Sequence, residues 1–168
     1  MLEVVEAGFP LRYDVADLML YHGPGSPAGV AHAVKVLELA LPLLGGGAPV
    51  ERREVRVTTP FAGPGARDAF EMVTRAVTEG RYVVDPALAR PERGPTLESF
   101  VFHLAYRGRA VTLVLRDAGH VSDEFVRLAR AERRTAQEDE RLTALKADMA
   151  RRLLALPAAE VYDVEVPA

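Results

Sequence analysis

Apolar residues recur along the chain in two spacings, one typical of helices and the other typical of strands. A spacing of three or four residues predicts helices over 14–22, 27–44 and 66–79. Alternation or a short apolar run predicts strands over 50–59, 82–84, 99–106 and 110–116. A turn at 107–109 makes the last two strands a hairpin. This order predicts one α+β domain over residues 1–168, with a mixed sheet of about four strands.

The segment 27–44 is apolar around most of its helical circumference, and His32, Lys35 and Glu38 are its polar positions. A helix of this kind is buried by several neighbours at once, so we expect it at the centre of the fold. Ser26, which a proline follows, is a favourable helix start, with the serine hydroxyl as the cap.

The C-terminal part from 122 to 156 contains neither glycine nor proline and is rich in strong helix formers. Residues 130–141 carry no large apolar side chain, and Thr135 and Glu138 have the spacing of a capping box. We therefore predict two helices, 122–133 and 136–155, followed by a short apolar strand or arm, VYDVEV.

The composition excludes several classes of protein. Of the 168 residues 49% are hydrophobic, the net charge is −3, and there is no cysteine, which excludes disulfides, thiol nucleophiles and zinc–thiolate sites. We expect no membrane span, no signal peptide and no nucleic-acid partner, and thus a cytoplasmic protein. Abundant arginine and the absence of asparagine fit either a thermophilic protein or a GC-rich coding bias.

Two glycine–proline loops, 22–29 and 60–67, each lead into a predicted helix. Helix N-termini attract anions, but neither loop matches a phosphate-binding motif. One interpretation is that the two loops are tight turns that join strands to helices and bind nothing. The other is a small anionic ligand at the loop–helix junctions, in a pocket whose polar groups are His22, Ser26 and Thr59.

The four histidines show no metal-binding spacing. His22 alone lies in a glycine-rich turn beside a helix start, where sites are commonly built. We expect His32 to be a hydrogen-bonded histidine of a buried helix, His103 to lie on a face of the sheet, and His120 to be solvated or to cap a helix. Ser26 lacks the context of a nucleophile elbow.

Several motifs occur in a characteristic order. HGPGSPA precedes GVAHAVKVLELAL, VRVTTPFAGPG precedes ARDAF, the aromatic hairpin SFVFHLAYRGRAVTLVL follows, and LLALP with VYDV ends the chain. In this order they resemble the formylmethanofuran dehydrogenase E-subunit-like family, over almost the whole chain. The resemblance implies an α-β-α-β-β-β core with C-terminal helices, and a homodimer.

The metal ligands of that family are largely missing here. The resemblance places Pro24 where the family has a second histidine, Ser26 where it has a cysteine, and Gly65 at about the position of a second-loop cysteine. Of these groups His22 alone remains. A hydroxyl replaces a thiolate poorly on a soft divalent ion, so we expect no cofactor and no tightly bound metal. One alternative is left open: a metal site that combines His22 with His32, Asp68 or a residue of a partner protomer.

Two functions follow as expectations. The first is an E-subunit-like protein that is non-catalytic or binds a small ligand through His22, Ser26, Thr59 and Asp68, as a homodimer. The alternative is an enzyme that acts on a small anionic or carbonyl substrate with His22 as the acid or base. The first is favoured, because the sequence places no second catalytic group beside His22.

Overall fold

The computed structural model describes residues 1–167 and has an α+β fold with two sheets. The five strands of the larger sheet are, in spatial order, β4 (Tyr82–Val84), β3 (Arg56–Thr59), β5 (Val101–Tyr106), β6 (Arg109–Leu115) and β7 (Tyr162–Glu165). The β3–β4 pair is parallel and the other pairs are antiparallel. The predicted α+β class with C-terminal helices and a mixed sheet is confirmed, and the C-terminal arm supplies the fifth strand.

The second sheet is a hairpin of β1 (Leu2–Glu6) and β2 (Phe9–Tyr13), which the sequence pattern did not predict. Ala7 and Gly8 form its two-residue turn with positive φ angles of 50° and 83°. Such a turn matches the twist of paired strands. Pro10 lies within the second strand, and because proline is rare inside sheets, it makes this segment unlike a strand in the sequence.

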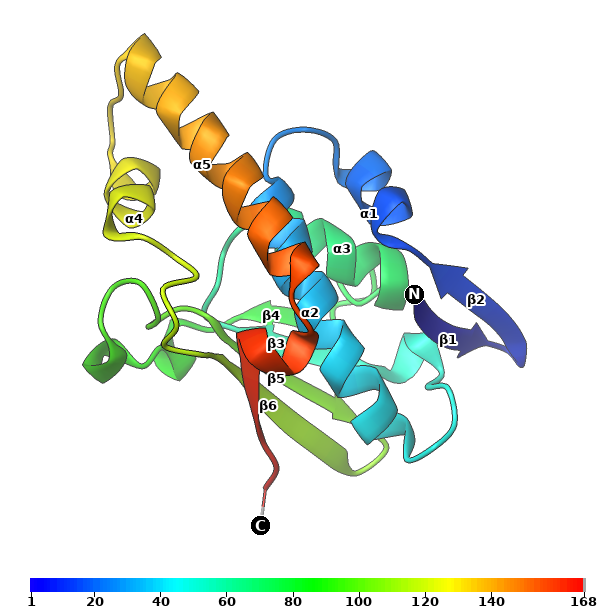
Figure 1. Cartoon of the computed structure of the whole chain (residues 1–168). Coiled ribbons are helices and arrows are strands. Elements are labelled where there is room, and N and C mark those ends of the chain that lie inside the picture. The colour runs from blue at the N-terminus through cyan, green and yellow to red at the C-terminus, as the bar shows by residue number, and fades with distance from the viewer. Residues whose placement is uncertain (168) are drawn as a thin grey trace.

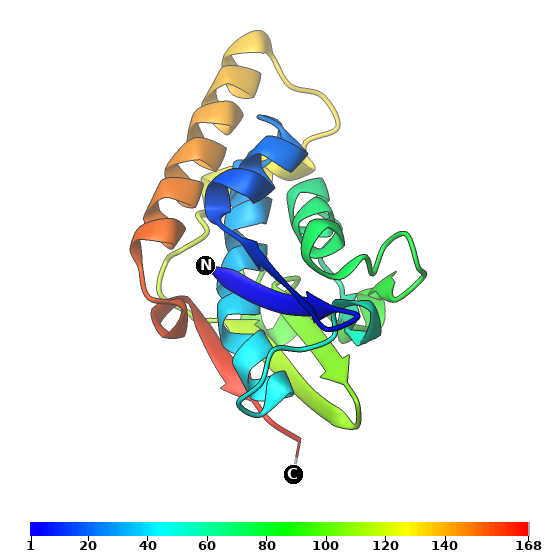
Figure 2. The ribbon, with the colours of Figure 1, turned by 90° about the vertical axis from the view of Figure 1, so that its right-hand side faces the viewer.

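Six helices lie in the described part of the chain: α1 (Val15–His22), α2 (Pro27–Gly45), α3 (Pro64–Thr74), α4 (Asp123–Arg130), α5 (Ala136–Ala155) and α6 (Ala158–Val161). Figures 1 and 2 show α2 crossing one face of the larger sheet, with α3 on one side and α5 on the other. Thirteen of its 19 residues are buried, so its predicted central position is confirmed.

The same helix bears on the expectation that the chain has no membrane span. Pro27–Gly45 is long and apolar enough to cross a bilayer by length and composition, although no such segment was expected. However, 72% of the apolar window is buried inside the fold, which is the burial of a core helix in a soluble protein.

The crossing of α2 over α3 has almost no space between the two backbones. A Cβ added at Gly29 would lie 2.9 Å from the amide nitrogen of Ala66, and a Cβ at Gly65 would overlap the carbonyl oxygen of Ser26 and lie 2.9 Å from the amide nitrogen of Val30. Glycine is required at both positions, because any side chain would separate the helices. This contact brings the two glycine–proline loops together.

Two predicted boundaries are wrong. The strand expected over 50–59 begins only at Arg56, because Arg52–Glu54 form a 3-10 turn. The helix expected over 66–79 runs from Pro64 to Thr74 and ends at Arg75, whose φ is 57°. Here the buried Glu71 carboxylate accepts hydrogen bonds from the amides of Val77 and Thr78, so the chain turns instead of continuing the helix.

The C-terminal helices form the predicted pair, with a break between Arg130 and Ala136. The capping box of Thr135 and Glu138 is present at the start of α5. The charged segment around the break pairs within the chain: Arg141 binds Glu124 at 2.7 Å, and Arg134 binds Asp139 at 2.7 Å. Part of the charge of residues 130–141 is therefore paired within the chain.

Candidate functional site

A cavity of about 460 Å³ lies where the two glycine–proline loops meet α4 and α5, and we call it the loop pocket. The first loop and the start of α2 contribute Ser26, Ala28 and Gly29. The remaining lining residues are Pro60, Phe61, Ala62, Gly63, Pro64, Pro95, Ser99, Phe100, Phe125, Val126, Ala129, Arg130 and Lys146. A mostly apolar cavity with a few polar groups is the usual form of a small-molecule site.

The electrostatics of the loop pocket favour an anion. None of the described residues that line it is acidic, and two, Arg130 and Lys146, are basic. Arg130 is paired with the neighbouring Glu98 at 2.6 Å. Lys146 donates a hydrogen bond to the carbonyl oxygen of Gly25 at 3.2 Å, and no carboxylate among residues 1–167 forms an ion pair with it. The N-termini of α2 and α3 add partial positive charge at the same place.

The candidate residues divide between the pocket and its surroundings. Ser26 lines the pocket and is the N-cap residue of α2, but its side chain forms no capping hydrogen bond, contrary to the predicted role of the hydroxyl. Thr59 is fully buried instead of facing the pocket. Its hydroxyl donates to the carbonyl of Val101 and accepts from the amide of Phe61, so it fixes the start of the second loop to the sheet.

His22 and Asp68 meet at a second place, between the end of α1 and the start of α3. The Nδ1 atom of His22 lies 2.8 Å from Oδ2 of Asp68, and 6% of the His22 side chain is exposed. Burial of Asp68 is the largest single influence and raises its pKa. The hydrogen bonds from His22 and Arg67 outweigh it, so the pKa of Asp68 lies below its ordinary value. The ionised carboxylate only accepts hydrogen bonds, so Nδ1 of His22 is the donor.

The orientation of His22 leaves its other nitrogen without a partner. Nε2 is buried and makes no hydrogen bond, and it lies 4.0 Å from the position of a Cβ added at Gly25. Neither His22 nor Asp68 lines the loop pocket. The structure therefore joins two of the four candidate residues into an aspartate–histidine pair, and it separates this pair from Ser26 and Thr59.

The other histidines are structural. His32 is buried in α2 and hydrogen-bonded to the Tyr162 hydroxyl at 2.7 Å, as predicted for a core histidine. His103 lies on the sheet beside Thr112, also as predicted. His120 is buried, with Nε2 3.1 Å from the carbonyl oxygen of Glu160 in the last turn of α6, so of its two expected roles the structure shows the helix-capping one and not the solvated one. Its ring contacts the backbone of α6 instead of facing solvent.

The donors at the first loop do not fit a tightly held metal ion. No three histidine, aspartate or glutamate side chains converge anywhere in residues 1–167. His22 and Asp68 bind each other, and His32 is bonded to Tyr162. The position equated with the second-loop cysteine, Gly65, has no room for a side chain of any kind. A structural zinc site needs four protein ligands and a catalytic site three.

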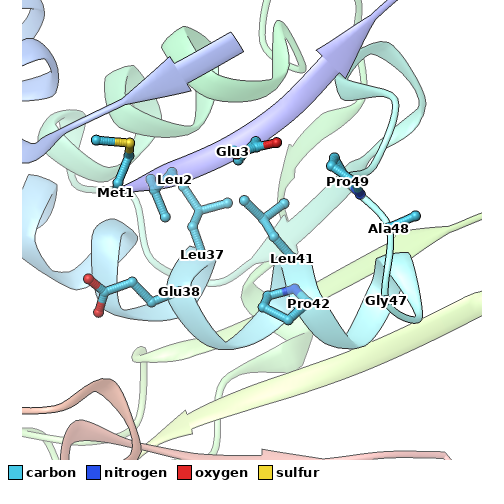
Figure 3. Close-up of a pocket in the computed structure, with 10 residues that line it drawn as sticks. All are labelled: Met1, Leu2, Glu3, Leu37, Glu38, Leu41, Pro42, Gly47, Ala48 and Pro49. Atoms are coloured by element: carbon cyan, nitrogen blue, oxygen red, sulfur yellow. The ribbon is translucent and has the colours of Figure 1, made fainter. Parts of the chain in front are cut away.

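A second depression of about 340 Å³ lies between β1 and the C-terminal half of α2. Figure 3 shows Leu37 and Leu41 of α2 directed toward the start of β1, while the Glu38 side chain points away from them. The Glu38 carboxylate is already paired with Lys35 at 2.9 Å. This groove has an apolar floor, and none of its described lining residues is a lysine or an arginine, so it has fewer polar side chains to bind a ligand than the loop pocket.

Comparison with known proteins adds no assignment, since no family model and no curated protein matches the chain. Function is therefore inferred from the residues of the site. Sequence reasoning missed the aromatic residues that line the loop pocket, and it missed Lys146. The aromatic residues are Phe61, Phe100 and Phe125, and they come in part from segments far from either loop. One signal was present: Lys146 is one of only two lysines in a chain whose other basic side chains are arginines.

Proposed function

We propose that this protein is a small-ligand-binding domain of the formylmethanofuran dehydrogenase E-subunit-like type, without tight metal binding and without catalytic activity. Its ligand is a small anion held in the loop pocket. The observation that carries the proposal is the pocket itself. Two glycine–proline loops, joined by the Gly29–Gly65 contact, enclose an apolar cavity. Its basic residues include Lys146, which forms no ion pair with a carboxylate of residues 1–167. Such a cavity offers binding energy and a counter-charge together.

A cytoplasmic homodimer completes the proposal. Its support is the family resemblance and the absence of cysteine, which suits a reducing compartment. We expect the C-terminal helices to reach the neighbouring protomer, because residues 130–141 carry no large apolar side chain and yet continue a helical stretch with apolar ends. Light scattering is expected to give twice the chain mass of 18.3 kDa, and a mass of one chain would contradict this part of the proposal.

Binding of a small anion is tested with acetate and backbone-amide NMR. We expect acetate to shift the amide signals of the non-proline loop residues that line the pocket, and sodium chloride at matched ionic strength to leave them in place. These residues are Ser26, Ala28, Gly29, Phe61, Ala62 and Gly63. Residues 37–49, beside the other groove, serve as an internal control. Equal shifts with both salts, or shifts confined to the control residues, would contradict the proposal.

A second candidate function rests on the His22–Asp68 pair. An aspartate that accepts from Nδ1 and leaves Nε2 free is the arrangement by which enzymes orient a histidine base. The structure thus supplies the second group that the sequence does not place. The binding function is favoured because Nε2 is buried and outside the pocket.

The catalytic alternative makes its own prediction with p-nitrophenyl acetate as a carbonyl probe. It requires hydrolysis that both His22→Gln and Asp68→Asn reduce by at least about a hundredfold, because general base catalysis contributes on that order. His103→Gln, at a histidine on the sheet away from both the pair and the loop pocket, is the matched control. No turnover, or turnover unchanged in both variants, would exclude this alternative for the probe's reaction class.

A further inference from the structure

The loop pocket has a continuous aromatic wall. The rings of Phe61 and Phe100 have centroids 4.9 Å apart with an interplanar angle of 31°, and Phe125 of α4 lines the same cavity. Phe100 is 3% exposed and in turn stacks against His32 of the core at 4.6 Å. Phe100 thus connects the wall to the aromatic core, while the partly buried Phe61 and Phe125 present ring surface to the cavity.

The position of Phe61 is fixed from two directions. Its backbone amide donates to the Thr59 hydroxyl, and its ring lies against Gly63 so closely that a Cβ there would overlap it. A ring held in this way keeps its place without a ligand. Preorganised aromatic surface lowers the entropic cost of binding a flat apolar group.

Lys146 at the same cavity has spare donors. Its ammonium group has three N–H donors, and one is used on the carbonyl oxygen of Gly25. Two remain for an anion. Since Arg130 is neutralised by Glu98, the pocket offers one uncompensated positive charge, which matches a monoanion better than a dianionic phosphate.

From this juxtaposition we infer that the ligand is an aryl-substituted carboxylate: a flat aromatic body against Phe61, Phe100 and Phe125, with a single carboxylate on Lys146. The inference rests on the proposed ligand-binding function and names the chemical class of the ligand. A cavity of about 460 Å³ is large enough for a ring and a short chain.

Three probes separate the two parts of the ligand: 3-phenylpropionate, 3-phenylpropan-1-ol, which lacks the charge, and propionate, which lacks the ring. Titration calorimetry on the full chain is expected to give a dissociation constant for 3-phenylpropionate at least about tenfold lower than for either of the others. One tenfold step corresponds to about 1.4 kcal/mol, which is the order of the contribution that a charged hydrogen bond or a buried ring makes.

Two variants assign the effects to residues. Lys146→Met keeps the apolar stem and removes the charge; it is expected to weaken 3-phenylpropionate about tenfold and to leave 3-phenylpropan-1-ol unchanged. Phe125→Ala is expected to weaken 3-phenylpropionate about tenfold and to leave propionate unchanged. Arg151→Met, an exposed cation of the same helix that is paired with Asp148, is the matched control for the charge. Circular dichroism checks that each variant is folded.

The outcomes distinguish this inference from the proposed function. If propionate binds as tightly as 3-phenylpropionate, the ligand class is wrong while an anion site stands. If Lys146→Met changes the binding of neither, the ligand class is wrong and Lys146 is not the counter-charge of an anion. If none of the three probes binds and acetate moves no amide signals, the proposed function itself fails. Binding of 3-phenylpropionate that Arg151→Met weakens as much as Lys146→Met would reflect general charge attraction and would also overturn the inference.

Discussion

Gly65→Ala is expected to lower the free energy of unfolding by about 3 kcal/mol, at the upper end of the usual cost of overpacking. The new methyl group would overlap the carbonyl oxygen of Ser26 and approach the amide nitrogen of Val30. Both contacts are backbone atoms at the start of α2, so no side-chain rotation relieves them. The two helices must move apart, and the buried surface between them is lost. Urea unfolding followed by circular dichroism measures the change.

The matched control is Gly45→Ala at the other end of α2. There an added Cβ meets only a side-chain methyl of Val50 at 3.5 Å and its amide nitrogen at 3.9 Å, which are ordinary contacts. Alanine favours helix over glycine, so this variant is expected to be neutral or more stable by up to about 1 kcal/mol. Equal stability of Gly65→Ala and Gly45→Ala would show that the helix crossing is not as tight as described.

The same crossing explains what the sequence revealed and what it did not. The apolar circumference of 27–44 predicted a central helix, because a helix that is buried on all sides has apolar residues around most of its circumference. The glycines at 29 and 65 read only as loop residues, because a close backbone contact between two helices depends on a partner far along the chain. The pattern of residues along the chain predicts secondary structure, whereas the contact between the two loops depends on the tertiary fold.

The site shows the same division. His22 was identified from its glycine-rich turn and Asp68 from the family resemblance, but their 2.8 Å contact joins residues 46 positions apart. Thr59 was expected in the pocket because it precedes a glycine–proline loop. Alternation along β3 instead places Thr59 on the same buried face as Val57, and its hydroxyl donates to the backbone carbonyl of Val101 in β5. The aromatic wall combines the second loop, the start of the hairpin and α4, a set that no sequence spacing brings together.

His32 is expected to make the protein sensitive to mild acid. Burial in α2, with a smaller effect from the charge of His120, lowers the pKa of His32 from 6.5 to about 3. The native imidazole therefore stays neutral down to about that pH, whereas the unfolded chain takes up a proton as the pH falls through 6.5. Unfolding then binds one proton more than the native state, so stability falls as the pH falls between these two values.

The expected loss from His32 is about 2 kcal/mol between pH 7.5 and pH 5, at about 1.4 kcal/mol per pH unit below 6.5. Urea unfolding at several pH values measures it, above the range in which carboxylates titrate. His32→Gln lowers stability at all pH values but removes this proton uptake, so its stability should fall less steeply over the same range. Gly45→Ala, which changes no titratable group, is the control and should keep the wild-type slope. Parallel curves for the wild type and His32→Gln would mean that other groups carry the acid sensitivity.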